Sequence, residues 1–169
     1  MTGSPSKSPE PRAVPSGLRV RGRLAVPSSK SLTHRYLDLA LLAGAPLVVE
    51  RPLLAEDTRL FLAALGRAGF AVDEKPEEVR LAPGPAGRGL ARPEVEIFCG
   101  NAGTMLRFLV AALAAIPGRW RLDGTPRLRE RPVGPLVTAL RRLGCGIECP
   151  GREGFAPLAI AGGTLGGGV

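Results

Sequence analysis

The chain has 169 residues, of which 44% are hydrophobic and 22% are charged, and its formal net charge is +8. This balance excludes a wholly disordered chain, and the lack of an apolar run of about 18 residues excludes a membrane-spanning helix. The length suits one domain with a real core, and three cysteines, an odd number, cannot all pair. The N-terminus has no signal-peptide pattern, so we expect a cytoplasmic protein with reduced thiols.

Pro, Ser and charged residues make up most of the first 16 positions, which predicts a disordered tail over residues 1–16. From Leu18 to Val26 apolar residues alternate with arginines, which predicts a half-buried strand. After Pro27 the apolar residues recur at helical spacing until Gly44, which predicts a helix that begins near the segment SSKS. Its apolar stripe comprises Leu32, Tyr36, Leu39 and Ala43.

The chain then alternates between short apolar runs and helical patterns. LVVE at 47–50 predicts a strand, and a second helix is expected from near Glu56 to Gly69, with Phe61 and Leu65 facing inward. Strands near 70–73 and 79–82 follow, and then a Pro/Gly-rich turn region over 83–93.

A second series repeats this order. VEIFC at 95–99 predicts a strand, GNAGT a turn, and the apolar stripe from Met105 to Ile116 a helix. WRLD at 120–123 predicts a strand. Pro132 is expected in the first turn of a helix that ends at Gly144, and GIEC and LAI complete the set as short strands.

The two series are similar in sequence. THRYLDLALLAG matches TMLRFLVAALAAIPG at an offset of 72, and LAALGRAGF matches VTALRRLGC at an offset of 75. This indicates an internal duplication and an α/β fold with mixed sheets. We expect a partial domain over residues 17–169, with repeat one at about 28–94 and repeat two at about 95–162.

SSKS and GNAGT both precede helices, where unpaired N–H groups favour an anion. In the first segment Lys30 adds a charge, Ser31 a hydroxyl, and Arg35 follows on the same helical face. In the second, Gly103 permits a close approach, Asn101 is the only asparagine, and Thr104 is a candidate N-cap. The alternative is a capping serine with solvated charges in one and an ordinary turn in the other.

The third cluster, PRLRERP at 126–132, holds Arg127, Arg129 and Arg131 before a helix. Such a run is usually a solvated loop, but Arg131 directly precedes Pro132 and is the candidate anion ligand. No P-loop, dinucleotide fingerprint or metal-binding motif occurs. The cysteines are expected to be core residues, and the single histidine, His34, is expected to be exposed rather than catalytic.

These residues resemble 5-enolpyruvylshikimate-3-phosphate synthase, the shikimate-pathway enolpyruvyl transferase family. The matching motifs are PSSKSLTHR at 27–35, EDTR at 56–59, GNAGTMLR at 100–107 and PRLRERPVGPLVTALRRLG at 126–144. The resemblance implies two lobes, each built from three βαβαββ units, with the substrates bound between them. This chain would hold the opening strand of one lobe and two of the three units of the other.

The resemblance implies transfer of enolpyruvyl from phosphoenolpyruvate to shikimate 3-phosphate, without metal or organic cofactor. By motif position Lys30 would contact both substrates and act as the catalytic residue. Ser31 and Arg35 would hold shikimate 3-phosphate, and phosphoenolpyruvate would be bound by Asn101, Gly103 and Arg131.

The sequence departs from the family pattern at three points. Ser28 replaces a common glycine, Phe108 stands where many members have proline, and the remaining units would lie beyond Val169. A cleft with one wall cannot exclude water, so we expect no turnover by the isolated chain. A missing C-terminal portion is a possible partner.

Other functions stay open on sequence alone. The positive charge is compatible with a nucleic-acid-binding module, although the arginines are dispersed and aromatic residues are only 4% of the chain. A relative of the UDP-N-acetylglucosamine enolpyruvyl transferase would share the fold, and a non-catalytic fragment is a third alternative. We expect neither nucleic acid nor membrane as a partner.

Overall fold

The computed structural model describes residues 13, 16, 17, 19, 21–84, 94–163, 165 and 166. Nearly all of the expected tail, and most of the expected turn region at 83–93, lie outside the described residues. The first half of the fold comprises helix α1 (Lys30–Ala43), strand β1 (Leu47–Glu50), helix α2 (Glu56–Arg67) and strands β2 (Phe70–Lys75) and β3 (Glu78–Pro83). The second half comprises β4 (Val95–Phe98), α3 (Gly103–Ala114), β5 (Gly118–Asp123), α4 (Pro126–Arg129), α5 (Gly134–Arg142), β6 (Gly146–Glu148) and β7 (Leu158–Gly162).

Each half contains one sheet, and the two sheets share a strand order. The first sheet is antiparallel with the order β1-β3-β2, and the second has the order β4-β5-β7-β6. The antiparallel part β5-β7-β6 repeats β1-β3-β2, whereas β4 pairs in parallel with β5. The duplication expected from the sequence is therefore seen in the topology, and the α/β class with mixed sheets is confirmed.

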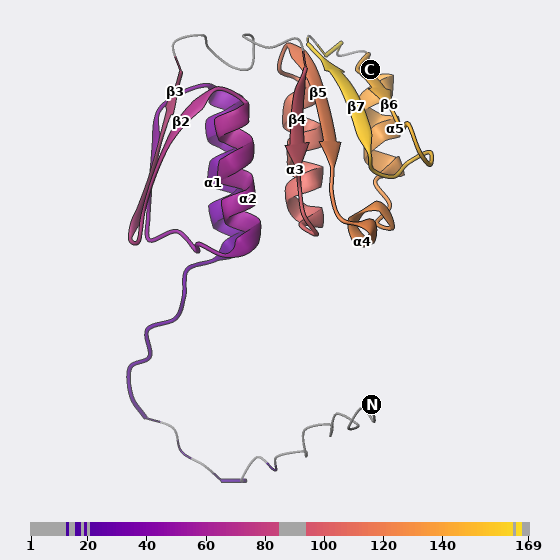
Figure 1. The fold of residues 1–169 in the computed structure, drawn as a ribbon. Helices are drawn as coiled ribbons and strands as arrows, with labels where there is room; N and C mark the ends of the chain where they lie inside the picture. Colours follow the sequence, from indigo (N-terminus) through magenta and orange to yellow (C-terminus); the bar gives the residue numbers. More distant parts are fainter. Residues whose placement is uncertain are drawn as a thin grey trace, which may run out of the picture.

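The strand predicted over residues 18–26 is the main disagreement with the sequence analysis. Residues 23–29 have no regular secondary structure, and Leu24 and Val26 are 87% and 76% exposed. Figure 1 shows this segment leading away from α1 and from the first sheet. Alternation indicates which face of a segment is apolar, but a strand also needs a neighbour for its backbone groups, and no described strand pairs with residues 23–29.

Helix α1 forms where it was predicted, but it buries a different face. Ser29 caps it by accepting a hydrogen bond from the N–H of Leu32, and Gly44 ends it in the left-handed conformation with φ of 61°. The buried side chains of α1 are Thr33, His34, Leu37, Ala40 and Leu41. All four residues of the predicted stripe, Leu32, Tyr36, Leu39 and Ala43, are exposed instead. The helix carries apolar residues on two faces, and spacing alone does not say which one meets the core.

Helices α1 and α2 lie between the first sheet and β4, and α3 lies behind β4 in this view (Figure 1). Helix α3 contacts α1, and α2 contacts β4, so the two halves share one core. The stripe predicted for α3 is confirmed, since Met105, Leu109 and Leu113 are buried. No helix within the described residues is long and apolar enough to cross a bilayer.

The segment before α5 differs from the prediction. Pro126 begins the short helix α4, which Thr125 caps by accepting from the N–H of Leu128. Pro132 lies outside the next helix, because α5 begins at Gly134 with Pro135 in its first turn. Pro126 and Pro135 occupy the first turns of α4 and α5, where a residue without an N–H is favoured. This preference alone does not distinguish them from Pro132, so it could not show that Pro132 lies outside a helix.

Candidate functional site

The helices that follow the two candidate turns begin at the same end of the molecule. In Figure 1 the N-terminal ends of α1 and α3 lie at the end where α4 also lies. The first turn of helix α2 contacts both candidate turns, through two residues that are three positions apart. Its Asp57 contacts Lys30, and its Leu60 lies against Gly100. The structure thus places the first-half turn and the second-half turn on either side of the start of α2.

Lys30 is the first residue of α1 and makes an ion pair with α2. Its Nζ lies 2.8 Å from Oδ2 of Asp57, and both side chains are partly exposed. Such a pair contributes little to stability in water, but it limits where the ammonium group can go. The sequence analysis missed Asp57 as a partner, since the two residues are 27 positions apart and the EDTR motif was its only signal.

Ser31 and Arg35 lie one helical turn apart on the exposed side of α1. Nη1 of Arg35 donates to the carbonyl oxygen of Ser31 at 3.0 Å and also contacts Oγ of Ser31. The guanidinium carbon of Arg35 lies 5.5 Å from the ring centroid of Phe108, which belongs to α3. Arg35 therefore bridges from the first half toward the second and remains open to solvent.

His34 is buried, which corrects the expectation that it is exposed. It is 1% exposed, its Nε2 lies 3.3 Å from Oγ1 of Thr58, and its ring meets Phe61 edge-on at 5.4 Å. Burial lowers the pKa of His34, an effect that nearby Asp57 partly offsets. A polar side chain with one hydrogen-bond partner can replace an apolar one in the core, and no sequence pattern indicated that partner.

The GNAGT turn is held by backbone hydrogen bonds. Gly100 has φ of 56°, and its carbonyl oxygen accepts from the N–H of Thr125 at 2.8 Å. A Cβ at Gly100 would lie 2.5 Å from the side chain of Leu60. Glycine therefore suits this position both for its positive φ and for the space that Leu60 occupies. Asn101 is exposed, and its carbonyl oxygen accepts from the N–H of Gly103 at 3.1 Å. Ala102, not Thr104, takes the N-cap position of α3.

Arg131 lies against the first residue of α3. Its Nη1 is 2.9 Å from the place of a Cβ at Gly103, and its own N–H donates to the carbonyl oxygen of Leu128. Arg107 fixes this arrangement from the next turn of α3. It donates from Nη1 to the carbonyl oxygen of Gly103 at 3.2 Å and from Nη2 to that of Pro132 at 3.1 Å.

The other two arginines of the cluster differ from Arg131. Arg129 forms a two-pronged pair with Asp123 at 2.8 and 2.5 Å, whereas Arg127 is exposed. The hydrogen bond from Arg129 lowers the pKa of Asp123, and the N–H of Gly124 adds to this effect. Arg129 is therefore paired within the fold, and Arg131 is the arginine directed at the GNAGT turn.

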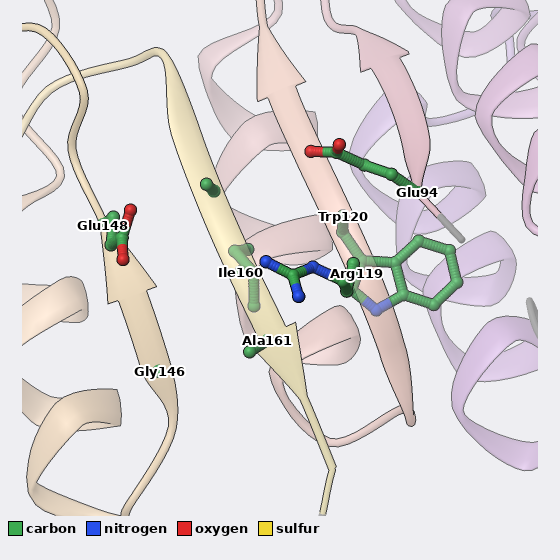
Figure 2. A pocket seen from close by; sticks show the side chains of 8 residues that line it. Glu94, Arg119, Trp120, Gly146, Glu148, Ile160 and Ala161 are labelled. Carbon is green, nitrogen blue, oxygen red and sulfur yellow. The ribbon is translucent and has the colours of Figure 1, made fainter. Parts of the chain in front are cut away.

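Other groups that carry chemistry are remote from the two turns or inert. Burial raises the pKa of the Cys99 thiol to about 12, and the charge of Asp123 adds to this. The described residues contain no group of three or more His, Cys, Asp or Glu side chains suited to a metal ion. A hollow of about 130 Å³ lies on the second sheet, with Glu94, Arg119 and Glu148 around it (Figure 2). It includes none of the predicted site residues.

Comparisons with known proteins agree with the sequence motifs. A family model described as EPSP synthase (3-phosphoshikimate 1-carboxyvinyltransferase) matches residues 14–169. The 3-phosphoshikimate 1-carboxyvinyltransferase of Bordetella pertussis is 43% identical over 152 residues, which are 90% of this chain and 34% of that protein. That of Syntrophobacter fumaroxidans is 44% identical over 149 residues, 88% of this chain and 35% of the relative.

A solved structure is also similar. EPSP synthase from Acinetobacter baumannii matches with a TM-score of 0.76 and 29% sequence identity, covering 88% of this chain and 34% of that one. The chain therefore spans about a third of the length of the curated relatives that it matches.

Proposed function

This chain belongs to the EPSP synthase family, and we propose that its two turns bind shikimate 3-phosphate and phosphoenolpyruvate. The reaction joins the 5-hydroxyl oxygen of shikimate 3-phosphate to the enolpyruvyl carbon of phosphoenolpyruvate. In the addition the hydroxyl loses its proton and the methylene carbon of phosphoenolpyruvate gains one, which gives a tetrahedral intermediate. In the elimination the bond to phosphate breaks and a proton leaves the new methyl group, which regenerates the double bond. No metal or organic cofactor enters this proposal.

The observation that carries the proposal is the contact between Arg131 and the start of α3. A guanidinium group and the N-terminal N–H groups of a helix both favour an anion, and here they converge on Gly103. The missing side chain at Gly103 lets the guanidinium group of Arg131 approach the start of α3 closely. A phosphate or carboxylate of phosphoenolpyruvate fits these donors, with the exposed amide of Asn101 beside them.

The first-half turn has the matching donors for shikimate 3-phosphate. Ser31 and Arg35 are exposed on α1, and the resemblance assigns both to this substrate. Lys30 stands at the start of the same helix, and the resemblance assigns it to both substrates. Its ammonium group can stabilise negative charge that develops during addition and assist proton transfer. Asp57 holds that group at the side of the turn that faces α2.

Binding and turnover are separate parts of this proposal. Because the chain spans about a third of its curated relatives, we propose that the 169-residue chain binds the substrates but does not convert them. Transfer needs reacting atoms held in line and shielded from water, and one wall of a cleft cannot supply both. Release of phosphate by the purified chain, lost on Arg131→Ala, would overturn this part.

Calorimetric titration tests the binding proposal. Phosphoenolpyruvate is titrated into the chain with saturating shikimate 3-phosphate, and Arg131→Ala is compared with Arg127→Ala. Charge-assisted hydrogen bonds contribute about 1.5–3 kcal/mol, so we expect Arg131→Ala to raise Kd at least about 10-fold. Arg127→Ala removes an exposed arginine of the same cluster and is expected to leave Kd unchanged. Equal Kd values for the two variants would contradict the assignment of Arg131.

The remaining alternatives are tested with the same protein. UDP-N-acetylglucosamine in place of shikimate 3-phosphate is expected to give no displacement. A salt titration against duplex DNA is expected to show no steep dependence, since the arginines of the site converge on a turn rather than forming a stripe. We further propose a cytoplasmic location, to be checked by fractionation of cells that express the protein.

A further inference from the structure

Three buried polar side chains gather beneath the start of α1. Apart from cysteine and tryptophan, the described residues with polar side chains that are buried are Thr33, His34 and Thr58, at 3%, 1% and 0% exposed. Thr33 and His34 lie within the first five residues of α1, and Thr58 is the third residue of α2. A buried polar group costs free energy unless it is hydrogen-bonded, so the partners of these side chains decide what they contribute.

Thr33 ties the SSKS turn to the connection that leads into α2. Its Oγ1 donates to the carbonyl oxygen of Ser29 at 3.0 Å and accepts from the N–H of Leu53 at 3.1 Å. Ser29 caps α1 and directly precedes Lys30. Leu53 lies between β1 and α2, four residues before Asp57. One hydroxyl group therefore links the residue before Lys30 to the segment that carries its ion-pair partner.

Two contacts, one exposed and one buried, join the starts of α1 and α2. The outer contact is the ion pair of Lys30 with Asp57, at 2.8 Å. The inner contact joins Nε2 of His34 to Oγ1 of Thr58 at 3.3 Å. His34 lies one helical turn after Lys30 on α1. Thr58 directly follows Asp57 on α2. Burial lowers the pKa of His34 most, Asp57 raises it and Lys30 lowers it, so both charges of the outer contact act on the inner one.

The second half of the fold has apolar residues in place of this polar cluster. The offset of 72 that aligns α1 with α3, and the offset of 75 that aligns α2 with α5, give the equivalent positions. The residues there are all buried, with Met105 in place of Thr33, Leu106 in place of His34 and Val133 in place of Thr58. Ala102 takes the place of Lys30. A unit of this fold therefore packs with apolar side chains at these positions, and the polar ones occur in the half whose first helix begins with a lysine.

We propose that Thr33, His34 and Thr58 are positioning residues, which hold Lys30 in place for the anionic substrates. The inference rests on the proposed function of the first-half turn and deepens it. All three side chains are buried, so they act through Ser29 and the start of α2 rather than by touching a ligand. The outer ion pair is partly exposed and restrains a long side chain only weakly. The buried hydrogen bonds fix the backbone on both sides of that pair, and a small displacement of a binding group weakens its interaction with a ligand strongly.

Paired substitutions at the two threonines separate the hydroxyl group from the volume of the side chain. Thr33→Val and Thr58→Val remove the hydroxyl and keep the volume, and valine is the residue that the second half has in place of Thr58. Thr33→Ser and Thr58→Ser keep the hydroxyl and remove a methyl group. Calorimetric titration with shikimate 3-phosphate is expected to show Kd raised at least about fivefold in each valine variant and changed by less than about twofold in each serine variant. Thr138→Val, at an exposed threonine of α5, is the control and is expected to leave Kd unchanged.

Thermal melts of the same variants distinguish positioning from a general loss of stability. Valine leaves a buried partner without its hydrogen bond, and serine leaves a small cavity, so both changes are expected to lower Tm. Affinity that is kept in the serine variants and lost in the valine variants follows the hydroxyl group and supports the proposal. Affinity that falls in step with Tm in all four variants overturns it, as does an unchanged Kd in a folded valine variant. Each threonine is changed separately, so one variant that fails to fold leaves the other pair as the test.

Amide order parameters of the ligand-free chain test positioning separately from substrate binding. NMR relaxation is expected to show lower order parameters for Lys30 and Ser31 in the valine variants than in the unmodified chain and the serine variants. Amides of α3 report whether each variant is folded. If the unmodified chain binds no shikimate 3-phosphate but the valine variants still lower these order parameters, the proposed function fails and the positioning of the turn is supported. Order parameters that stay equal in folded valine variants overturn the positioning itself, even where the unmodified chain binds the substrate.

Discussion

Nη1 of Arg131 lies 2.9 Å from the position that a Cβ atom would occupy at Gly103. These residues come from different elements, yet the guanidinium group occupies the space that a side chain would otherwise fill. The contact brings the arginine cluster to the start of α3, and Arg107 donates to the carbonyl oxygens of Gly103 and of Pro132, the residue after Arg131.

Gly103→Ala tests this contact directly. The added methyl group would meet the flexible end of Arg131, so the arginine moves while α3 keeps its fold. We expect Kd for phosphoenolpyruvate, measured by calorimetry, to rise about 10-fold, which corresponds to about 1.4 kcal/mol. Gly66→Ala in α2 is the control, because no atom lies within 4 Å of its new Cβ. Unchanged affinity in Gly103→Ala would show that Arg131 does not bind the ligand from this position.

Arg107 is expected to act through Arg131 rather than by touching the ligand. Arg107→Lys keeps the charge but cannot donate to the carbonyl oxygens of both Gly103 and Pro132 in the same way. We expect it to raise Kd for phosphoenolpyruvate several-fold and to leave Kd for shikimate 3-phosphate unchanged. Arg67→Lys, at an exposed arginine of α2, serves as the control. Equal weakening of both substrates by Arg107→Lys would indicate a general loss of structure instead.

The Lys30–Asp57 pair predicts a variant that binds its ligand more tightly, whereas the two variants above bind more weakly. Asp57 competes with any anion for the ammonium group of Lys30. Removing its charge in Asp57→Asn is expected to lower Kd for shikimate 3-phosphate about fivefold at low salt, since a unit charge at about 4 Å in water contributes about 1 kcal/mol. The loss of stability should stay below about 1 kcal/mol, because the pair is partly exposed.

Calorimetry and thermal melts measure the two effects of Asp57→Asn. Asp73→Asn, which removes the same charge from the Lys75 pair on β2, is the control and is expected to leave affinity unchanged. Weaker binding in Asp57→Asn would mean that Asp57 aids binding by positioning Lys30 more than it opposes binding by charge.

Asp38 on α1 gives a prediction about pH. Its Oδ1 is buried without a hydrogen-bond partner among the described residues, and burial raises the pKa of Asp38 to about 6. The folded chain then binds more protons at this site than the unfolded chain between about pH 4 and 6. The ionised carboxylate therefore destabilises the fold above about pH 6, and this penalty disappears as the pH falls below about 4.

Asp38→Asn is expected to stabilise the chain by about 1–2 kcal/mol at pH 8 and to have no effect near pH 4. Urea unfolding at the two pH values measures the difference. Burial lowers the pKa of His34, so protonation of His34 destabilises the fold as the pH falls. The unmodified chain and the Asp38→Asn variant both contain His34, so this effect cancels in the comparison. Asp73→Asn, at an exposed aspartate, should change stability by less than about 0.5 kcal/mol at either pH. A gain at pH 4 equal to that at pH 8 would contradict this role of Asp38.

Sequence patterns predicted most helices and strands because the spacing of apolar residues reflects the period of the element that buries them. Helix α3 is apolar over most of its circumference and eight of its twelve residues are buried, so the predicted stripe is buried whichever side meets the core. Helix α1 has apolar residues on two faces, and its spacing predicted a helix but not that Leu37 rather than Tyr36 enters the core. The alternation from Leu18 to Val26 predicted an apolar face but could not say whether a sheet edge receives it.

The candidate site residues were predicted from residue types that favour anion binding, and their role as a site stays a prediction. Lys30, Arg35 and Arg131 stood out as charges near helix starts, and the structure places each beside a turn. Two contacts were not predicted because they join residues far apart in the sequence: Asp57 pairs with Lys30, and Arg107 donates to the carbonyl oxygen of Pro132 beside Arg131. Burial of His34 depended on Thr58, which is remote in sequence. Long-range partners of this kind leave no local pattern.

The central claim is that the turns of the two halves form one binding site for two anionic substrates. Amide NMR spectra of the chain, recorded during addition of shikimate 3-phosphate and then phosphoenolpyruvate, test it most directly. We predict that Ser31 and Arg35 shift with the first ligand, that Asn101, Gly103 and Arg131 shift with the second, and that Glu148 does not move. Shifts confined to one turn, or centred on the hollow around Arg119 and Glu148, would contradict it.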